Sequence, residues 1–499
     1  MKVLNERECG RGFSDFRLDG RKDNFPYAMT MAYIVMFAFL IRLVTAASYL
    51  NSYDTEWNIM WAVQLGKDFF SAHMHVSSLD YPPLYLYPLY AVGRLVSVES
   101  IGGYPPFRML AIKFIPCLTD SLTCVVLYRL ASRRNRQIGQ LAAMLWAINP
   151  AGIFNCACWG QTDCVLMFMA SLLILALDEK RVIASGVLWA AMCSVKLQGL
   201  YLTPVIGMEV LTICFGRLSP KAFSFSDITK SSVKRFTGFL CAAAGTLAVI
   251  YLPFMLGSGF SAYHPEMSFT ERFFKPLTVY SEGLAKYPYI TLNADNIYML
   301  LGKNGVNDEL RFFPGVSVHT LGSLFLLLAM ALVVAVYLFG RRHSPWLAAF
   351  MFMECVFMLT CRQHERYQIL TLVLLMGAFV RHADRRLLTL FSLHSVVIFF
   401  NQFRVLSLVR ENSGWWHYYR GTRTVNSELM QNVYRSGADW VDSTGVFSRV
   451  NALMNVCLFI ASMVFVIRFF VDEDSGRPLS VCLRERLERQ TEKSADSFE

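Results

Sequence analysis

The sequence predicts an all-α, polytopic membrane protein built from about twelve transmembrane helices, and three observations lead to this fold class. Hydrophobic residues make up 55% of the 499 residues and charged residues only 17%, whereas an ordinary soluble domain carries roughly 25% charge. Apolar runs of bilayer-spanning length recur along the chain. Basic clusters fall in alternate connections between these runs, as expected for cytoplasmic loops. This composition excludes a disordered chain, a nucleic-acid-binding protein and most soluble enzymes.

Twelve mostly apolar segments meet or approach the length of about 20 residues that a membrane helix needs. They are 27–47, 109–131, 138–156, 162–177, 182–195, 197–215, 236–257, 317–339, 345–361, 367–380, 386–402 and 449–471. The preceding residues 1–26 are of mixed charge and lack a small-residue cleavage site. We therefore expect the first segment to be a retained helix and not part of a signal peptide.

The orientation of the spans follows from the positions of Lys and Arg in the short loops. With twelve spans and a cytoplasmic N-terminal segment, every basic cluster falls on the cytoplasmic side: Arg133, Arg134 and Arg136, then Lys180 and Arg181, Arg217 to Arg235, Arg341 and Arg342, and Arg381, Arg385 and Arg386. Residues 84–98 are apolar but short, and they contain Pro88 and Arg94. We predict an interfacial helix there, within an external loop, and not a further span.

This topology gives the chain five parts and long loops on one face. The parts are a cytoplasmic N-terminal segment (1–26), a transmembrane module (27–402), an external loop with Trp415, Trp416, Tyr418 and Tyr419 (403–448), a last transmembrane helix (449–471) and a cytoplasmic tail (472–499). Two more external loops, 48–108 and 258–316, lie within the module. Loops of this length are usually functional. We expect a site at the external face, with 258–316 folded over it.

The first external loop contains candidate acid–base residues. Asp54 and Glu56 follow the first span closely, and a carboxylate near the membrane surface can act as a general base on an acceptor hydroxyl. The alternative is that Asp54 is a solvated acidic residue; Glu56 is the alternative base. Trp61, Asp80 and Tyr81 follow in the same loop and are candidates for lining a substrate site.

Two short polar motifs lie at the same face. Trp159, Gln161 and Asp163 occupy a tight turn between two spans, and Lys196 and Gln198 lie between the next two. Each motif also has a structural interpretation, because Trp anchors at membrane interfaces and Lys at a span boundary extends its ammonium group to water. We predict that these residues line a substrate site, with Lys196 on the side of an anionic group.

A cluster of charged side chains marks the external end of the ninth span. Arg362, His364, Glu365 and Arg366 lie within seven residues beside an apolar helix. Arginines there can bind a lipid phosphate through their fork of N–H groups; the alternative is a plain boundary cluster. The topology is assigned from the basic loops alone, without reference to these motifs. It nevertheless places all of them on one face of the membrane.

As an ordered set, the motifs resemble the GT-C superfamily of polyprenyl-phosphate-sugar-dependent glycosyltransferases, over roughly residues 50–370. The elements similar to dolichyl-phosphate-glucose glucosyltransferases are Asp54-x-Glu56-x4-Trp61 and Asp80-Tyr81-Pro82-Pro83-Leu84. The elements more similar to prokaryotic GT-C mannosyltransferase-type proteins are Trp159-Gly160-Gln161-x-Asp163, Lys196-x-Gln198 and His364-Glu365-Arg366-Tyr367. This mixture leaves the donor sugar open between glucose and mannose.

The resemblance implies a GT-C-type bundle and an inverting transfer of a hexose from a polyprenyl-phosphate-linked donor. The acceptor would be a hydroxyl of a lipid-linked glycan, a glycolipid or another molecule, at the external or luminal face of the membrane. Asp54 would be the catalytic base, and Arg362, His364 and Arg366 the groups on the phosphate side. We expect no metal and no cofactor, because the external face carries no Asp-x-Asp motif. The membrane would be the endoplasmic reticulum in a eukaryote and the plasma membrane in a prokaryote.

Two other functions are consistent with parts of the sequence. A multi-spanning transporter or flippase of lipid or sugar is suggested by charged residues inside predicted spans, namely Arg42, Lys113, Asp120 and Glu354. An oligosaccharide ligase or polymerase acting on lipid-diphosphate donors is the alternative within the enzyme class. The concentration of polar motifs at the external face favours the monosaccharide transferase.

The topology is testable with reporter fusions. Fusions placed after Arg136, Arg235 and Arg342 should all report a cytoplasmic location, because these residues belong to basic loops. An external signal after Arg136 would show that residues 84–98 cross the membrane and that twelve spans is the wrong number.

Overall fold

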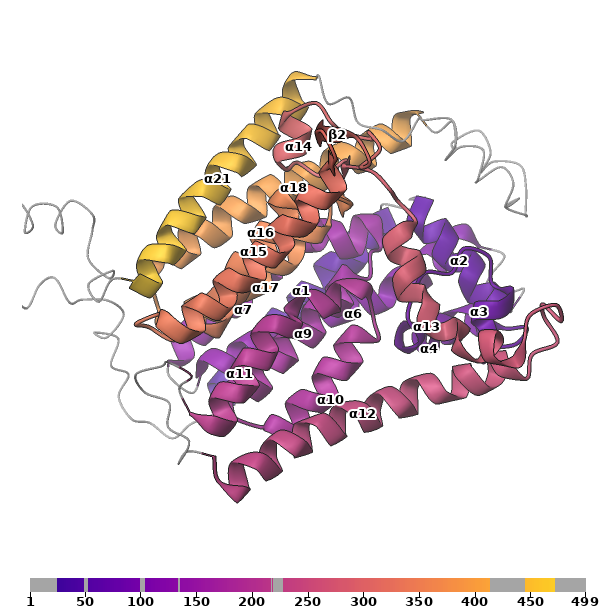
Figure 1. The fold of residues 1–499 in the computed structure, drawn as a ribbon, viewed down its shortest axis with the longest axis horizontal. Coiled ribbons are helices and arrows are strands. Elements are labelled where there is room, and N and C mark those ends of the chain that lie inside the picture. Colours follow the sequence, from indigo (N-terminus) through magenta and orange to yellow (C-terminus); the bar gives the residue numbers. More distant parts are fainter. Residues whose placement is uncertain are drawn as a thin grey trace, which may run out of the picture.

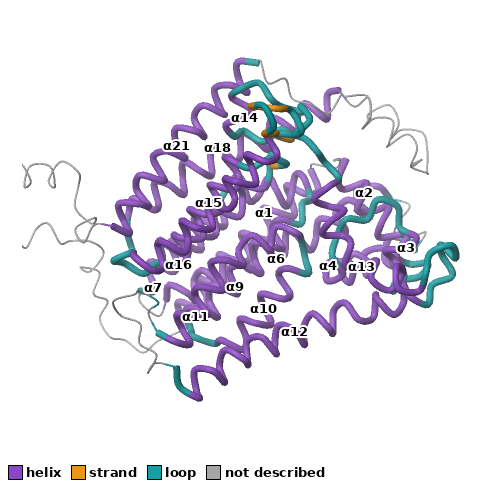
Figure 2. The backbone as a smooth tube through the Cα atoms, viewed as in Figure 1, coloured by secondary structure: helices purple, strands orange, loops and turns teal. Residues whose placement is uncertain are grey.

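The computed structural model describes residues 25–48, 53–98, 104–132, 135–216, 218, 228–412 and 445–471. They form a helical bundle with a few very short strands (Figures 1 and 2). In chain order the elements are α1 (Phe25–Ser48), α2 (Tyr53–Leu65), α3 (Ala72–His75), α4 (Pro83–Val96), α6 (Pro105–Ser132), α7 (Arg136–Ala147), α8 (Pro150–Ile153), the π-helix η2 (Phe154–Trp159), α9 (Asp163–Asp178), α10 (Val182–Cys193), the 3₁₀-helix η3 (Leu197–Leu202), α11 (Thr203–Phe215), α12 (Lys230–Gly259), α13 (Phe269–Ala285), β1 (Thr291–Leu292), α14 (Ile297–Leu300), β2 (Arg311–Phe313), β3 (Val316–Ser317), α15 (Val318–Phe339), α16 (Pro345–Leu359), β4 (Gln363–His364), the 3₁₀-helix η5 (Tyr367–Ile369), α17 (Leu370–His382), α18 (Arg385–Asn412) and α21 (Val446–Val471).

Each of the twelve predicted spans coincides with helical structure. Among the described residues, seven helices are long and apolar enough to cross a membrane, or eight if the bent pair Arg136–Ala147 and Pro150–Trp159 is one span. The remaining predicted spans are the shorter helices α9, α10, α16 and α17. Nearly all side chains of α16 and α17 are buried. The polytopic, all-α fold class is therefore confirmed, and four of the predicted spans form helices shorter than those that cross a bilayer alone.

The short helices that carry the candidate site gather at one end of the bundle. Figure 1 shows α2, α3, α4 and α13 grouped beyond the ends of α6, α9 and α10. Residues 84–98, predicted as a short helix outside the spans, form α4, which has 14 residues and is absent from the candidate spans. It packs closely on α2, since a Cβ at Gly93 would lie 1.8 Å from the carbonyl oxygen of Ala62. Only glycine permits this approach.

The segment 258–316, predicted to be an external loop, folds back onto the end of the ninth predicted span. It contains α13, α14 and strands β1 to β3. Strand β1 pairs in parallel with β4, so that Thr291 lies opposite Gln363 and Leu292 opposite His364. This pairing places the loop against the segment that carries the predicted charged cluster.

Some predicted boundaries differ from the structure, and some lie outside it. The eleventh span was expected to end at residue 402, but α18 continues to Asn412. Most of the predicted third external loop, residues 413–444 with Trp415, Trp416, Tyr418 and Tyr419, lies outside the described residues. So do residues 1–24 and the predicted tail 472–499.

A buried ion pair accounts for two of the charged residues found inside predicted spans. Arg42 on α1 and Asp120 on α6 are both fully buried, and their side chains meet at 2.7 Å. Every guanidinium nitrogen of Arg42 has an acceptor: Nε donates to Asp120, Nη1 to the carbonyls of Ala38 and Ala147, and Nη2 to the carbonyl of Trp146. Trp146 in turn donates from Nε1 to Asp120 at 3.1 Å. The pair therefore ties α1, α6 and α7 together.

Loss of one partner of this pair should strongly destabilise the bundle. Arg42→Met leaves Asp120 as an uncompensated buried carboxylate, which typically costs about 3–5 kcal/mol. The measurement is the thermal unfolding midpoint of the purified protein in detergent. The double variant Arg42→Met with Asp120→Leu removes both charges and should recover most of the loss. Equal destabilisation by the single and the double variant would contradict this account.

Candidate active site

The carboxylate of Asp54 lies at the junction of three sequence segments. It belongs to the first turn of α2. Trp159 donates a hydrogen bond to its Oδ2 from Nε1 at 2.8 Å, and Gln161 donates to the same oxygen from Nε2. Nη1 of Arg366 lies 3.9 Å from this oxygen. The Asp54 side chain is nevertheless 31% exposed, so a substrate can reach a carboxylate that the protein already holds in place.

A change of helix type brings Trp159 and Gln161 to Asp54. Pro150 starts the short helix α8 after α7, and the chain then widens into the π-helix η2. Gly160 ends η2 in the left-handed region, with φ of 76°, a conformation that glycine adopts without strain. A Cβ there would lie 2.5 Å from Cγ2 of Thr55. Glycine at 160 therefore permits both the turn and its close packing on α2.

Beside Asp54, positive and negative side chains alternate. Nζ of Lys196 lies 2.7 Å from Oδ1 of Asp163. Nε of Arg366 lies 3.7 Å from the other oxygen of Asp163, and its Nη1 lies 2.5 Å from Glu365. Lys196, Asp163, Arg366 and Asp54 thus form a continuous chain of charges. Pairing of this kind offsets the cost of removing such groups from water.

The local environment keeps Arg366 charged and His364 neutral. Burial lowers the pKa of Arg366, but the carboxylates of Glu365 and Asp54 outweigh it and hold that pKa well above its usual range. Burial also raises the pKa of Glu365, yet Arg366 and His364 together lower it to about 2. For His364, burial lowers the pKa below its ordinary value despite the nearby Glu365. At neutral pH, Arg366 therefore carries the positive charge of this motif.

Aromatic rings frame the charged cluster. The guanidinium of Arg366 lies 5.7 Å from the ring centroid of Trp159 and 5.8 Å from that of Tyr367, within the range of cation–π attraction. The ammonium of Lys196 lies 5.5 Å from the Tyr367 ring. His364 packs against Tyr367 at 4.9 Å. The rings limit the orientations that the long cationic side chains can take.

Four of the predicted residues lie in the site's supporting structure. Arg362 has other partners than expected, since its Nε lies 2.6 Å from Asp308 and its Nη1 donates to the carbonyl of Leu284. Asp80 pairs with Lys286 at 2.7 Å. These two contacts fasten the 258–316 loop.

The other two residues, Tyr81 and Trp61, lie behind the turn formed by residues 159–163. The Tyr81 hydroxyl accepts a hydrogen bond from Thr162 at 3.0 Å. The ring of Tyr81 meets that of Trp61 edge to face at 5.6 Å, and Nε1 of Trp61 donates to the carbonyl of Ser77. Both rings are buried, so they support the turn from inside the protein.

Glu56 and Gln198 are also buried, in contrast to Asp54. Oε1 of Gln198 accepts no hydrogen bond within the part of the chain that the structure describes. The structure thus gathers Asp54, Trp159, Gln161, Asp163, Lys196 and Arg366 into one cluster, and it leaves Asp54 as the more accessible of the two candidate bases.

Sequence reasoning missed a second ion pair next to this cluster. Asp295 and Arg404 are both buried and bonded to each other. Burial raises the pKa of Asp295 to about 6, and the carboxylate of Glu365 adds to that increase, against the opposing effect of Arg404. Arg404 lies two residues beyond the predicted end of a span. A charged residue at a membrane helix end, followed by apolar residues, was the signal that could have found it.

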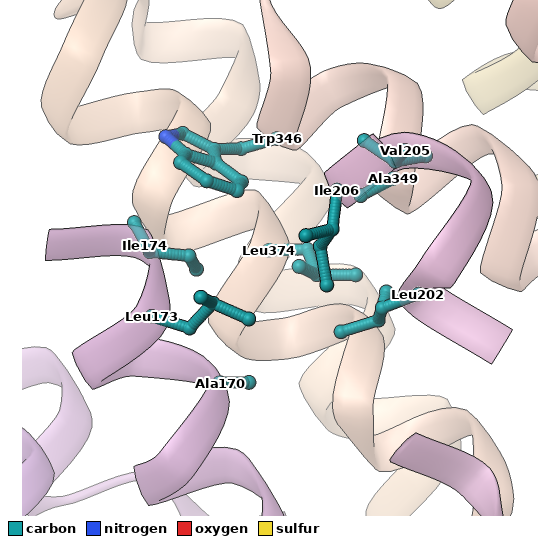
Figure 3. A pocket seen from close by; sticks show the side chains of 9 residues that line it. All are labelled: Ala170, Leu173, Ile174, Leu202, Val205, Ile206, Trp346, Ala349 and Leu374. Atoms are coloured by element: carbon teal, nitrogen blue, oxygen red, sulfur yellow. The ribbon is translucent and has the colours of Figure 1, made fainter. Parts of the chain in front are cut away.

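An apolar pocket elsewhere in the bundle is distinct from this site. Figure 3 shows it between α9, α11, α16 and α17, with Trp346 at one side. Its lining residues are Ala170, Leu173, Ile174, Leu202, Val205, Ile206, Trp346, Ala349 and Leu374. It contains no charged side chain, so it offers nothing for acid–base chemistry.

One group of possible metal ligands is present among the described residues, and its chemistry does not favour a cation. Asp120, Cys156 and Cys164 place their ligand atoms within 4.8 Å of one another. Asp120 already pairs with Arg42 at 2.7 Å, so the positive charge that a metal would supply is in place. All three residues are buried, so this cluster belongs to the core of the bundle.

Comparison with known proteins identifies the class of enzyme. Residues 81–362 match the sequence model of glycosyltransferase family 87. Because this range covers more than half of the chain, the protein belongs to that family. The family assignment confirms the resemblance to GT-C glycosyltransferases and the prediction of a membrane glycosyltransferase, and it favours the enzyme over the transporter alternative.

Comparisons with curated proteins and with solved structures do not narrow the function further. No curated protein sequence matches the chain. The fold is similar to the crystal structure of an Archaeoglobus fulgidus oligosaccharyltransferase tethered with an acceptor peptide, with a TM-score of 0.36 and 10% identity. The likeness covers 86% of this chain and 55% of that one, so the chain spans about half the length of that protein. A likeness at this level gives no information on substrates.

The hydrogen bond from Trp159 should matter for catalysis more than for folding. Trp159→Phe keeps a ring in place but removes the N–H that holds Asp54, and hydrogen bonds to charged groups are worth about 1.5–3 kcal/mol. We expect the rate of sugar transfer to fall by at least about tenfold. The matched control is Trp189→Phe, which removes an N–H bonded to Thr203 and should leave the rate near wild type. Equal rates for both variants would contradict a role for the Trp159 contact.

Proposed function

We propose that the protein transfers a hexose, mannose or glucose, from a polyprenyl-phosphate-linked donor to an acceptor hydroxyl, with inversion at the anomeric carbon. The acceptor is a lipid-linked glycan, a glycolipid or another hydroxyl-bearing molecule at the external or luminal face. The observation that carries this proposal is the partly exposed Asp54 carboxylate, held by Trp159 and Gln161 with Arg366 at 3.9 Å. This arrangement combines a base and a fixed cation at one point.

The reaction is a single displacement. Asp54 takes the proton of the acceptor hydroxyl as that oxygen bonds to the anomeric carbon. The bond between the anomeric carbon and the phosphate oxygen breaks, and the polyprenyl phosphate leaves with the bonding electron pair. Negative charge therefore grows on the phosphate oxygen in the transition state, and a nearby fixed cation stabilises it.

Asp54 is better placed than Glu56 to be the base. Its side chain is 31% exposed, whereas Glu56 is buried. A general base must come within hydrogen-bond reach of the proton that it takes. Two N–H donors also orient the Asp54 carboxylate, so little reorganisation is needed when the acceptor arrives.

Arg366 is the main group on the phosphate side. It lies half-buried beside Asp54, remains charged, and its Nε makes no hydrogen bond within the described ranges. Lys196 acts beside it through Asp163. His364 is neutral at neutral pH and can donate a single N–H to the phosphate. Arg362 contributes by holding the 258–316 loop through Asp308.

No metal is required by this mechanism, since Arg366 and Lys196 supply positive charge near the leaving group. The lipid-linked donor arrives through the bilayer, which is consistent with a candidate site at the end of a bundle in which seven or eight of the described helices are of membrane-spanning length. Transfer that is unchanged after treatment with EDTA would support the metal-free mechanism.

Asp54→Asn should abolish turnover while leaving the protein folded. The substitution keeps shape and polarity but removes the base, and loss of a general base typically costs about 10²–10⁴ in rate. The assay is transfer or release of sugar from polyprenyl-phosphate-mannose, -glucose and -arabinose by the purified protein. Glu56→Gln is the matched control and should retain most activity. If Asp54→Asn stays within a few-fold of wild type and Glu56→Gln is inactive, the base is Glu56; activity in both refutes acid–base catalysis by this loop.

Arg366→Ala should give the complementary result, with donor binding weakened. Removing a charge-assisted contact to the phosphate costs about 1.5–3 kcal/mol, or at least about tenfold in affinity. Donor affinity of Asp54→Asn, measured in parallel, should remain near wild type. Unchanged donor affinity in Arg366→Ala would remove this residue from the phosphate side.

A further inference from the structure

Asp295, in the 258–316 loop, is hydrogen-bonded to two other segments of the chain, the end of α18 and the start of α21. Its Oδ1 accepts a hydrogen bond from Nη2 of Arg404 on α18, and its Oδ2 accepts one from Nδ2 of Asn451 on α21. Its backbone N–H donates to Asn401 at 3.1 Å, and its carbonyl accepts from Asn455 at 2.8 Å. All of these side chains are buried. The position and orientation of Arg404 are therefore well determined.

Two neighbours connect this ion pair to the cluster around Asp54. Val405 and Leu406, which follow Arg404, pack in one apolar cluster with Trp159, the residue that bonds Asp54. On the other side, the charge of Glu365 acts on Asp295, and Glu365 pairs with Arg366.

Asn455 links the 258–316 loop, which contains Asp295, to the segment that carries Arg366. It bonds the carbonyl of Asp295 at 2.8 Å and the side chain of Gln368 at 2.9 Å. The end of α18 and the start of α21 thus hold the part of the 258–316 loop that contains Asp295.

Arg404 has donor groups that the described structure does not use. Its side chain is 5% exposed, and its Nε and Nη1 have no acceptor among the residues described. Arg42, equally deep in the bundle, has an acceptor for each of its nitrogens. Buried guanidinium N–H groups are nearly always hydrogen-bonded in native proteins. These two N–H groups, beside the candidate site, are available to an acceptor atom of a bound substrate.

We propose that Arg404 is a second anion-binding residue of this site, and that its Nε and Nη1 groups bind phosphoryl oxygen of a lipid-linked substrate. The inference rests on the proposed function, because it places the phosphate of a lipid substrate next to Asp54. That phosphate belongs either to the polyprenyl donor or to the head group of a phospholipid-based acceptor. Asp295 is a positioning residue, which holds Arg404 through Nη2 and leaves the other two nitrogens for the ligand.

Binding of two probes to the full-length protein tests the proposal. The first is a short-chain isoprenyl monophosphate, compared with the isoprenol of the same length. The second is phosphatidylinositol in mixed micelles, compared with diacylglycerol. Arg404→Gln should weaken binding of at least one phosphate probe by about tenfold or more and leave the phosphate-free partners unchanged. The matched control is Arg385→Gln, at the other end of α18, which should bind both probes like wild type.

A double variant distinguishes a loss of phosphate binding from a loss of folding. Arg404→Gln alone leaves Asp295 as an unpaired buried carboxylate, which can unfold the bundle. The double variant Asp295→Asn with Arg404→Gln removes both charges and should fold, as judged by its unfolding midpoint. It should show the same loss of phosphate binding.

The outcomes separate this inference from the proposed function. Weakened isoprenyl-phosphate binding assigns Arg404 to the donor, and weakened phosphatidylinositol binding assigns it to the acceptor; either supports the inference. If wild type binds only phosphatidylinositol, and does so through Arg404, the donor assignment fails while the Arg404 site stands. If the variants bind both probes as wild type does, or if wild type binds neither, the Arg404 inference is wrong.

Discussion

The contact between Asp54 and the turn after η2 is the constraint on which the candidate site depends. It joins residues more than a hundred positions apart, and it forms only because Gly160 adopts a left-handed conformation against Thr55. The π-helix before that turn advances the chain so that Trp159 and Gln161 both donate to one oxygen of Asp54. A carboxylate held in this way needs little rearrangement to accept a proton.

Charge compensation explains how so many ionised groups coexist at the end of a membrane bundle. An isolated charge in such surroundings is costly, and pairing offsets that cost. Arg42 with Asp120, Lys196 with Asp163, and Arg404 with Asp295 all follow this rule. Arg42 uses every nitrogen of its guanidinium inside the protein, whereas Lys196 and Asp163 belong to the cluster around Asp54, and Arg404 keeps two nitrogens without an acceptor among the described residues. This difference separates a structural pair from pairs that can serve substrates.

The matched family range, 81–362, is not the whole site. Asp54 precedes this range, and Arg366 and Arg404 follow it. Helices α18 and α21 also lie after it, and they hold the Asp295 loop through Asn401, Asn451 and Asn455. The C-terminal helices therefore hold the loop around Asp295 as well as completing the bundle, so substitutions there can displace this loop although they lie outside the family's matched range.

The sequence by itself determined the helical membrane fold, because apolar runs and basic loops report directly on the bilayer. It also determined most of the cluster around Asp54, since polar motifs at span ends fall on one face once the topology is known. Only the tertiary structure decided the partners. Arg362 turns to Asp308, Glu56 is buried, and Arg404 meets Asp295. Side chains at such sites choose partners from distant segments through burial and charge compensation, and neither is encoded in local spacing.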